Sequence, residues 1–320
     1  MAYHQTVQDL YRNAAVQPAK DLCCIAQSPK FLPGLIVPDI MHEMNYGCGS
    51  TVHLQDMRPD QRMLYVGVGG GLELLQLAYF ARHVGGVIGI DPVAEMREAA
   101  RANLEQAAEV NEWFDPSFVS ILDGDALALP VQDGSIGFAA QNCLFNIFQQ
   151  DDLQIALREI HRVLEPGGRL VMSDPITPRE IPTHLADDER LRAMCLSGCL
   201  KYEDYLQAIV DAEFGAIEIR SRRPYRLLDS IEYDLQEDLL LETLELAAFK
   251  TPIPDDGACV FTGKTAIYRG EAEYWDDGNG HVLRKNIPQG VCDKTAAALA
   301  TEPEVVVTGS TWHYQGDGCC

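Results

Sequence analysis

The sequence predicts an α/β fold in which helices cover both faces of a doubly wound parallel sheet. Five short apolar runs with strand character, at residues 63–66, 87–90, 118–122, 136–140 and 169–173, alternate with helical patterns. Strands that alternate with helices usually form a parallel sheet. A glycine-rich turn follows the first run, and an acid follows the second. Ligands of such sheets bind beyond the carboxyl ends of the strands.

The glycine-rich turn and the acid suggest a binding site for a nucleotide-type cofactor. Gly67, Gly69 and Gly71 let the turn tighten and allow a ligand to approach the backbone, facing the N-terminus of the next helix. Asp91 ends the second strand and can accept both hydroxyls of a ribose. The alternative is a plain tight turn with a solvated acid. Both strands and the acid together favour the cofactor site.

Two further strand ends extend this predicted site. Asp125 and Ala126 follow the third strand, where they can meet the amino group and the ring face of an adenine. Asn142 and Cys143 follow the fourth strand. We therefore expect four neighbouring strand ends to build one cofactor site.

The remaining patterns give three expected domains. Residues 1–60 form an N-terminal helical arm with a cysteine loop, residues 61–224 the sheet domain, and residues 225–320 a smaller C-terminal α+β domain. Asp151 or Asp152 is a good N-cap for the helix before the fifth strand. Residues 175–200 form a polar insertion, helical from about residue 187. Outside the sheet core we expect helices at 1–20, 93–110, 151–164, 201–212 and 231–250, and strands at 216–220 and 259–268.

Composition excludes several classes of partner. The net charge of −23 argues against nucleic acid and against an anionic membrane surface. No run is long and apolar enough to span a bilayer, and the first residues lack the pattern of a signal peptide. We therefore expect a cytoplasmic protein. In that compartment the ten cysteines are more often free, catalytic or metal-binding than paired as disulfides.

The glycine turn, Val66-Gly67-Val68-Gly69-Gly70-Gly71, and the later EPGGRL segment resemble the class I methyltransferases, which have a Rossmann-like fold. The resemblance implies S-adenosyl-L-methionine as cofactor, with its methionine part over Gly67, Gly69 and Gly71. Asp91 would take the ribose and Asp125 with Ala126 the adenine. Tyr65 departs from the family, which commonly has an acid there to orient the methionine amino group. A nicotinamide cofactor would explain neither Asp125-Ala126 nor the EPGGRL segment.

Three cysteines far apart in sequence are expected to converge at the same edge. Cys48 lies in a glycine loop before the sheet, Cys143 at the end of the fourth strand, and Cys195 in the insertion after the fifth strand. A single cysteine is usually a small buried hydrophobic residue, but three converging by chance is less common. Zinc would be an alternative, although the usual paired C-x2-C spacing is absent.

The residues around these thiols resemble the arsenite methyltransferases. The matching segments are Tyr46-Gly47-Cys48-Gly49, Asn142-Cys143 with Asn146-Ile147, Cys195-Leu196-Ser197-Gly198, Ile287-Pro288-Gln289-Gly290-Val291-Cys292 and Cys319-Cys320. These segments also resemble a bacterial branch of the family associated with arsenosugar biosynthesis.

The resemblance implies that Cys48, Cys143 and Cys195 hold arsenic, with Asn142 beside the cofactor. Cys23 or Cys24 would relay thiol chemistry between rounds. Position relative to Gly198 favours Cys195 over Cys199 as the working thiol, while Cys259 and Cys292 are expected to be structural.

The chemistry agrees with these residue types. Soft thiolates select soft, thiophilic centres such as trivalent arsenic. Arsenic held by three thiolates keeps a lone pair that can attack a sulfonium methyl group, so no general base is needed. Methylation formally oxidises the arsenic and implies a thiol reductant of the glutathione or thioredoxin type. The substrate would be arsenite or methylarsenite, and the role arsenic detoxification or arsenosugar biosynthesis. The alternatives are a methyltransferase of a small organic metabolite and a metalloid-binding protein without activity.

Overall fold

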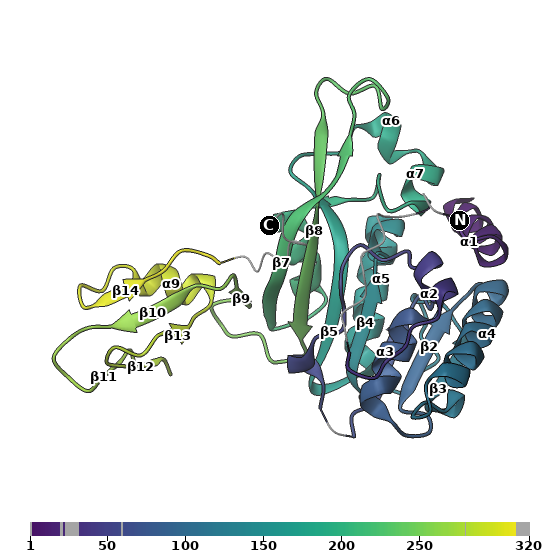
Figure 1. The fold of residues 1–320 in the computed structure, drawn as a ribbon. Helices are drawn as coiled ribbons and strands as arrows, with labels where there is room; N and C mark the ends of the chain where they lie inside the picture. The colour runs from purple at the N-terminus through teal and green to yellow at the C-terminus, as the bar shows by residue number, and fades with distance from the viewer. Residues whose placement is uncertain (1, 20–21, 23–31, 59, 279, 312–320) are drawn as a thin grey trace, which may run out of the picture.

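The computed structural model describes residues 2–19, 22, 32–58, 60–278 and 280–311. Within these residues a mixed sheet is flanked by helices on both faces, and a small C-terminal lobe stands to one side (Figure 1). The strands of the main sheet are β1 (Met63–Val66), β2 (Val87–Asp91), β3 (Val119–Asp123), β4 (Ile136–Asn142), β5 (Leu164–Thr177), β6 (Leu200–Lys201), β7 (Ala216–Leu228), β8 (Leu239–Phe249) and β9 (Cys259–Phe261).

The helices lie mostly between these strands in the chain. They are α1 (Ala2–Val16), α2 (Asp39–Glu43), α3 (Leu72–Ala81), α4 (Ala94–Val110), α5 (Gln150–Val163), α6 (Thr183–Ala186), α7 (Glu189–Ala193), α8 (Tyr202–Asp211) and α9 (Asp293–Leu299). None of the helices in the described part of the chain is long and apolar enough to cross a membrane.

The strand order is β3-β2-β1-β4-β5-β8-β7-β9, with β6 paired to β5. Strands β1 to β5 are mutually parallel, so their carboxyl ends meet at one edge. The order reverses between β1 and β4, which is where ligands of such sheets bind. This confirms the predicted doubly wound, class I methyltransferase fold.

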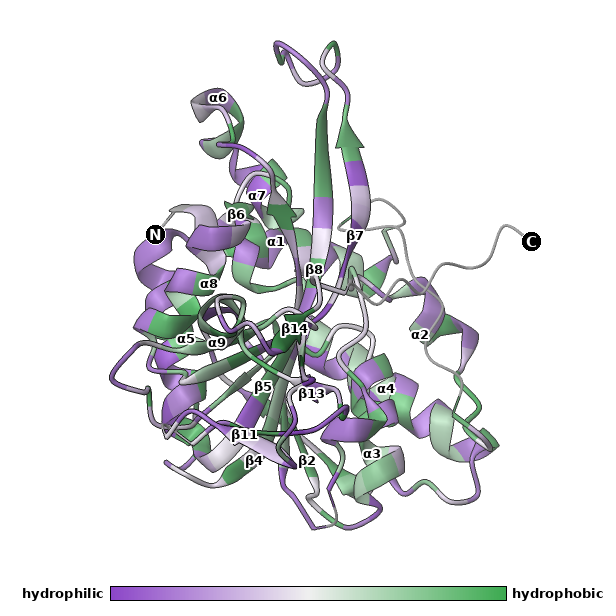
Figure 2. Cartoon of the chain, turned by 90° about the vertical axis from the view of Figure 1, so that its left-hand side faces the viewer, coloured by the Kyte–Doolittle hydropathy of each residue, from purple (hydrophilic) through white to green (hydrophobic). Residues whose placement is uncertain are grey.

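Two apolar layers hold the sheet between its helices. Alternate residues of β1 point to opposite faces: Leu64 and Val66 pack in the layer that contains α5 and α8, whereas Met63 and Tyr65 pack in the layer that contains α3 and α4. The central strands are accordingly mostly hydrophobic, whereas β7 and β8 also carry hydrophilic segments and the surrounding helices mix hydrophilic and hydrophobic residues (Figure 2). A strand buried on both faces needs apolar residues on both, which explains the continuous apolar runs.

The prediction of a helix at 231–250 is wrong. Its first part is turn, and Leu239–Phe249 form strand β8, which lies antiparallel between β5 and β7. Its leucines fall at helical spacing, but its two acids are paired across the sheet: Glu242 with Arg222 and Glu245 with Arg223 of β7. Sheet pairing on both sides, together with these ion pairs, outweighs the local helical pattern.

Strand β7 is longer than the expected 216–220 and runs through the expected domain boundary at residue 224, so the sheet continues beyond it. The hairpin formed by β7 and β8 projects past the rest of the sheet (Figure 1). Neither Asp151 nor Asp152 caps α5, because its N-cap is Gln149 and makes no side-chain hydrogen bond. The strand expected at 259–268 is divided into β9 and β10.

The C-terminal lobe has an apolar core of its own, to which Ala266, Leu283 and Leu299 belong. Helix α9 packs beside a small sheet of β10, β13 and β14 and a β11–β12 hairpin. The strands are β10 (Thr265–Tyr268), β11 (Tyr274–Asp276), β12 (Val282–Arg284), β13 (Gln289–Gly290) and β14 (Val305–Val307).

Candidate cofactor and thiol site

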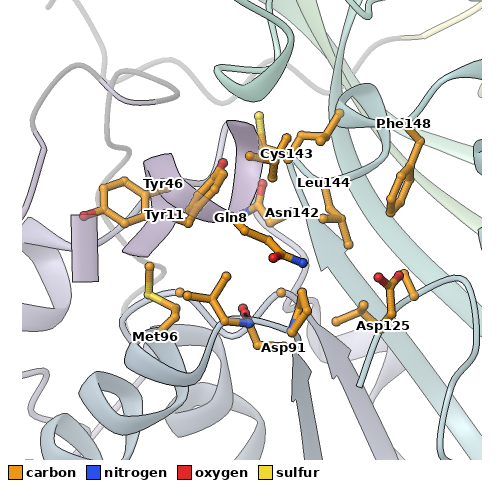
Figure 3. Close-up of a pocket in the computed structure, with 18 of the residues that line it drawn as sticks. Gln8, Tyr11, Tyr46, Asp91, Met96, Asp125, Asn142, Cys143, Leu144 and Phe148 are labelled. Carbon is orange, nitrogen blue, oxygen red and sulfur yellow. Dashed lines mark hydrogen bonds between the residues drawn. The ribbon is translucent and has the colours of Figure 1, made fainter. Parts of the chain in front are cut away.

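A pocket lies at the carboxyl ends of β1, β2 and β4 (Figure 3). The strand ends of the main sheet supply one part of its wall, and helix α1 another. The predicted residues that line it are Gly67, Gly69, Asp91, Asp125, Ala126, Asn142 and Cys143. Gly71 is not in the wall; it is the N-cap of α3, with its Cα facing the backbone of Ala100.

The glycine turn needs its glycines for backbone reasons. Gly67 and Gly69 line the pocket with φ of 81° and 49°, in the left-handed region where a side chain causes strain. A ligand can therefore approach the backbone here. This is the geometry expected for a turn that passes beneath a cofactor.

Asp91 fastens this turn to the end of β2. Its Oδ2 accepts a hydrogen bond from the Val68 amide at 3.0 Å, and its Oδ1 accepts one from the Val93 amide at 2.9 Å. Burial raises the pKa of Asp91 to about 6, although these two hydrogen bonds and Arg97 act in the opposite direction. The carboxylate is thus held in place while its side chain faces the pocket.

Asp125 lies further along the same wall, at the end of β3, separated from Asp91 in the close-up (Figure 3). Its Oδ1 accepts a hydrogen bond from the Leu127 amide at 2.9 Å, which fixes the turn that presents Ala126. The separation of the two acids along one wall suits a nucleoside, with its ribose at Asp91 and its base at Asp125.

The three predicted thiols lie in one cluster. Cys48, Cys143 and Cys195 are all buried and share an apolar cluster with Tyr3 and Ile147. Cys143 lines the pocket, whereas Cys48 and Cys195 are not among its lining residues. Segments separated by 95 and 52 residues therefore meet at the predicted edge of the sheet.

The sulfur atoms of Cys195 and Cys48 are directed to oxygen atoms of neighbouring residues. The Cys195 thiol donates to the carbonyl oxygen of Cys143, with an Sγ to O distance of 2.7 Å. The Cys48 Sγ lies 3.4 Å from Ser173 Oγ and 3.5 Å from Thr243 Oγ1. Among the described residues no three His, Cys, Asp or Glu side chains are already placed to hold a metal ion. The thiols are neighbours that must turn toward one another to bind one atom together.

The backbone at two of these cysteines is unusual. Cys143 and Cys195 have φ of 60° and 57°, in the left-handed region that residues other than glycine seldom adopt. Such strain persists only where the surrounding structure imposes it, and it concentrates at functional sites.

Cys199 belongs to a different cluster. It packs with Leu196 and Leu241, and its thiol donates to the Cys195 carbonyl oxygen at 3.4 Å. The geometry therefore places Cys195, and not Cys199, beside Cys143. Cys23, Cys24, Cys319 and Cys320 lie outside the described residues.

Known proteins resemble this chain both in sequence and in fold. Residues 64–172 match the family model of a methyltransferase domain. An arsenite methyltransferase from Aquipseudomonas alcaligenes is 30% identical over 324 residues, which cover 98% of this chain and 88% of that protein. The chain belongs to the arsenite methyltransferase family.

More distant relatives align over less of their length. The arsenite methyltransferases of Halobacterium salinarum and Rattus norvegicus are 28% and 30% identical over 67% and 66% of this chain, and the alignments span 52% and 55% of those proteins. The crystal structure of an arsenic(III) S-adenosylmethionine methyltransferase from Chlamydomonas reinhardtii has a TM-score of 0.61 at 21% identity, covering 91% of this chain and 100% of that one. That likeness is one of fold.

Glu73 is a pocket residue that sequence reasoning missed. It lies in the first turn of α3, and its Oε1 accepts a hydrogen bond from Asn142 Nδ2 at 3.1 Å. It also bonds to the hydroxyl of Tyr65, the residue that replaces the acid common in class I methyltransferases. Burial raises the pKa of Glu73, opposed by these hydrogen bonds. The signal was available, because Glu73 is the single acid in the stretch 72–81.

Asn142 connects this carboxylate to the loop that carries Cys48. Its Oδ1 accepts from the Cys48 amide at 2.9 Å, while its Nδ2 donates to the Gly49 carbonyl at 2.9 Å as well as to Glu73. A Cβ at Gly47 would lie 2.1 Å from Asn142 Nδ2, so glycine is required for the loop to pass so closely. One amide therefore holds the cysteine loop against the cofactor pocket.

Helix α1 also lines the pocket, which its amphipathic pattern alone did not reveal. Tyr3, His4, Val7, Gln8 and Tyr11 all face it. The helix is attached to other elements by hydrogen bonds from the Tyr3 hydroxyl to the Asp152 carboxylate and, at 2.6 Å, from Thr6 Oγ1 to Glu189 Oε2.

Proposed function

We propose that the protein transfers methyl groups from S-adenosylmethionine to trivalent arsenic held by the thiolates of Cys48, Cys143 and Cys195. The observation that carries this proposal is the shared cluster of three thiols, one of which lies in the wall of the cofactor pocket. Family membership supports the same reaction.

The pocket residues fit this cofactor. Asp91 is buried at a strand end with its carboxylate fixed, as an acceptor of ribose hydroxyls should be. Gly67 and Gly69 leave the backbone accessible to the methionine part, and Asp125 with Ala126 lies where an adenine would extend. Glu73 offers the negative charge for the methionine ammonium group that Tyr65 does not carry. When bound, the cofactor supplies an electrophilic methyl group on a sulfonium.

The chain's own contribution is to hold and orient the substrate. Arsenic bound by three thiolates is pyramidal and keeps a lone pair on its open side. Cys143, in the pocket wall, brings that side toward the cofactor. The cofactor, held by Asp91 and the glycine turn, would supply the methyl group of the new arsenic–carbon bond, and its sulfur–methyl bond would be the one broken, leaving S-adenosylhomocysteine. The reacting arsenic carries no proton, so no general base is required, and positioning supplies the acceleration.

The product arsenic is formally two electrons more oxidised than the substrate. We assign these two electrons to a thiol reductant of the glutathione or thioredoxin type, with Cys23 or Cys24 as relay. A cytoplasmic location, where such thiols are kept reduced, is part of the same proposal. A role in detoxification or in the arsenosugar branch of the family is part of the proposal.

An arsenic speciation assay tests the reaction and the site together. Arsenite, S-adenosylmethionine and a thiol are incubated with the protein, and products are separated by chromatography with arsenic detection. We expect methylated arsenicals from the natural protein and a loss of roughly 100-fold in Cys48→Ser, Cys143→Ser and Cys195→Ser, because misplacement of the reacting atom costs about that much. Cys199→Ser is the matched control and keeps its activity.

Calorimetric binding of S-adenosylmethionine should be unchanged in all four variants. Full activity in Cys143→Ser would contradict the three-thiolate site. If no methylated arsenic forms although the cofactor binds, the substrate is instead a small organic metabolite.

A further inference from the structure

Cys259 and Cys292 form a second thiol pair, away from the cofactor pocket. Cys259 begins β9 at the edge of the main sheet, and Cys292 is the N-cap of α9 in the C-terminal lobe. The two thiols interact with each other, and neither is in a disulfide. Cys292 is 4% exposed, while Cys259 is half-buried and can be reached from solvent.

Hydrogen bonds on both sides of Cys292 fix this arrangement. Thr262 Oγ1, just after β9, donates to Asp293 Oδ1 at 2.6 Å. Lys294 Nζ donates to the Gly257 carbonyl at 2.5 Å and pairs with the Asp256 carboxylate. The start of α9 is therefore tied to the segments before and after Cys259, so the two thiols face each other in a defined geometry.

We propose that Cys259 and Cys292 form a dithiol site that binds monosubstituted trivalent arsenicals, such as methylarsenous acid. This inference rests on the proposed function, because methylarsenous acid, after reduction, is the product of one round of that reaction. Such a compound carries two exchangeable hydroxyl groups and one fixed carbon substituent on arsenic. Two thiols can therefore replace both exchangeable groups.

The binding step is balanced without any oxidant. Two thiols and R–As(OH)2 give R–As(S)2 and two molecules of water: two arsenic–sulfur bonds form, two arsenic–oxygen bonds break, and the thiol protons leave with the hydroxyl groups. No net proton is released, which agrees with a burial that raises the pKa of the Cys259 thiol and keeps it neutral. Two sulfur atoms that already interact with each other need little movement to bind one arsenic atom.

The number of ligands distinguishes this site from the catalytic cluster. In the part of the chain that the structure describes, no third His, Cys, Asp or Glu joins the pair in a metal-binding group. Thr295 Oγ1 lies 3.1 Å from Cys292 Sγ and 3.2 Å from His281 Nε2, so a hydroxyl stands between the pair and that imidazole. Inorganic arsenite has three exchangeable positions and binds three thiolates. It is thus better matched to Cys48, Cys143 and Cys195.

Phenylarsine oxide, an aryl arsenical with two exchangeable positions, is the probe. The full-length reduced protein is treated with it, and adducts are counted by native mass spectrometry. We expect Cys259→Ser, Cys292→Ser and the double variant each to carry one adduct fewer than the natural protein, since both thiols are needed for one adduct. Thr295→Ala, which touches the Cys292 sulfur but supplies no thiol, keeps the full number. Binding of S-adenosylhomocysteine verifies that each variant is folded.

A second measurement uses the unmutated chain, so that it holds even if a variant fails to fold. Phenylarsine oxide should protect Cys259 from maleimide, as read by peptide mass spectrometry, and dimercaptopropanol should reverse the protection. An unchanged adduct number in Cys259→Ser, or undiminished labelling of Cys259, would overturn the proposal.

The two proposals fail separately. Methylation of arsenite together with an unchanged adduct number in the variants rejects only the second thiol site. The expected loss of one adduct in a protein that does not methylate arsenite rejects only the reaction.

Discussion

The pH dependence of cofactor binding depends on Asp91. Burial raises the pKa of this carboxyl to about 6, and the ribose hydroxyls need the ionised form as acceptor. Lowering the pH through 6 protonates Asp91 and removes that acceptor, so affinity must fall toward acid. Linkage of one proton gives a loss of about tenfold between pH 7 and pH 5. Above pH 7 the affinity should be nearly constant.

Asp91→Asn removes the charge but keeps the size. A hydrogen bond to a charged group contributes about 1.5–3 kcal/mol, so loss of one such bond weakens S-adenosylmethionine binding by about 10- to 150-fold. The variant should also lose the part of the pH dependence that Asp91 contributes, whereas the part from Glu73, whose pKa is likewise raised by burial, should remain. Isothermal titration calorimetry at several pH values measures both quantities.

Two controls isolate the group. Asp123→Asn changes an exposed acid whose charge raises the pKa of Asp91, so it should keep the dependence with a slightly lower midpoint. His4→Gln removes a histidine of the same pocket and should leave the dependence in place. A flat profile in the natural protein, or an unchanged slope in Asp91→Asn, would refute this reasoning.

Three further changes have expected outcomes. Glu73→Gln should weaken S-adenosylmethionine by about tenfold or more, through loss of a charged partner for the ammonium group, while adenosine, which lacks that group, binds as before in the same calorimetric assay. Gly198→Ala should lower the free energy of unfolding, measured by urea titration, by about 1–3 kcal/mol, because the added Cβ would lie 1.8 Å from a backbone oxygen. Gly290→Ala is the control: it has open space around it, so the same change there should be nearly neutral. Asp56→Ala should destabilise the protein by about 3–5 kcal/mol, because it leaves Arg169 buried without its partner; a smaller loss in thermal or urea unfolding would mean that water reaches that arginine.

Local patterns were sufficient to predict the parallel half of the sheet. The alternation of strands and helices, the glycine turn and the acids at strand ends all act between neighbours in the chain. Their predicted positions agree with β1 to β5 to within a few residues at most ends. The carboxyl ends of parallel strands share one edge of the sheet. The sequence was therefore sufficient to predict that Asp91, Asp125 and Cys143 lie at the same edge.

The errors arise where distant segments decide the outcome. Strand β8 has a leucine pattern that suits a helix, and only its antiparallel partners on both sides make it a strand. Glu73 and helix α1 enter the pocket because of how α3 and α1 are packed, which a pattern along the chain does not encode. The pairing of Cys259 with Cys292 likewise depends on docking the C-terminal lobe against the edge strand.

The position of Asn142 has a thermodynamic consequence. One side-chain amide serves both the backbone of the Cys48 loop and the carboxylate that faces the cofactor, so a shift imposed on one side is transmitted to the other. Linked binding equilibria are reciprocal. If the bound cofactor changes the affinity for the arsenical by some factor, the bound arsenical must change the affinity for the cofactor by the same factor. Asn142→Ala should weaken the coupling between the two equilibria, beyond any loss of affinity for either ligand alone. The two substrates would then be bound more nearly as independent partners, and the order in which they arrive would matter less to their affinities.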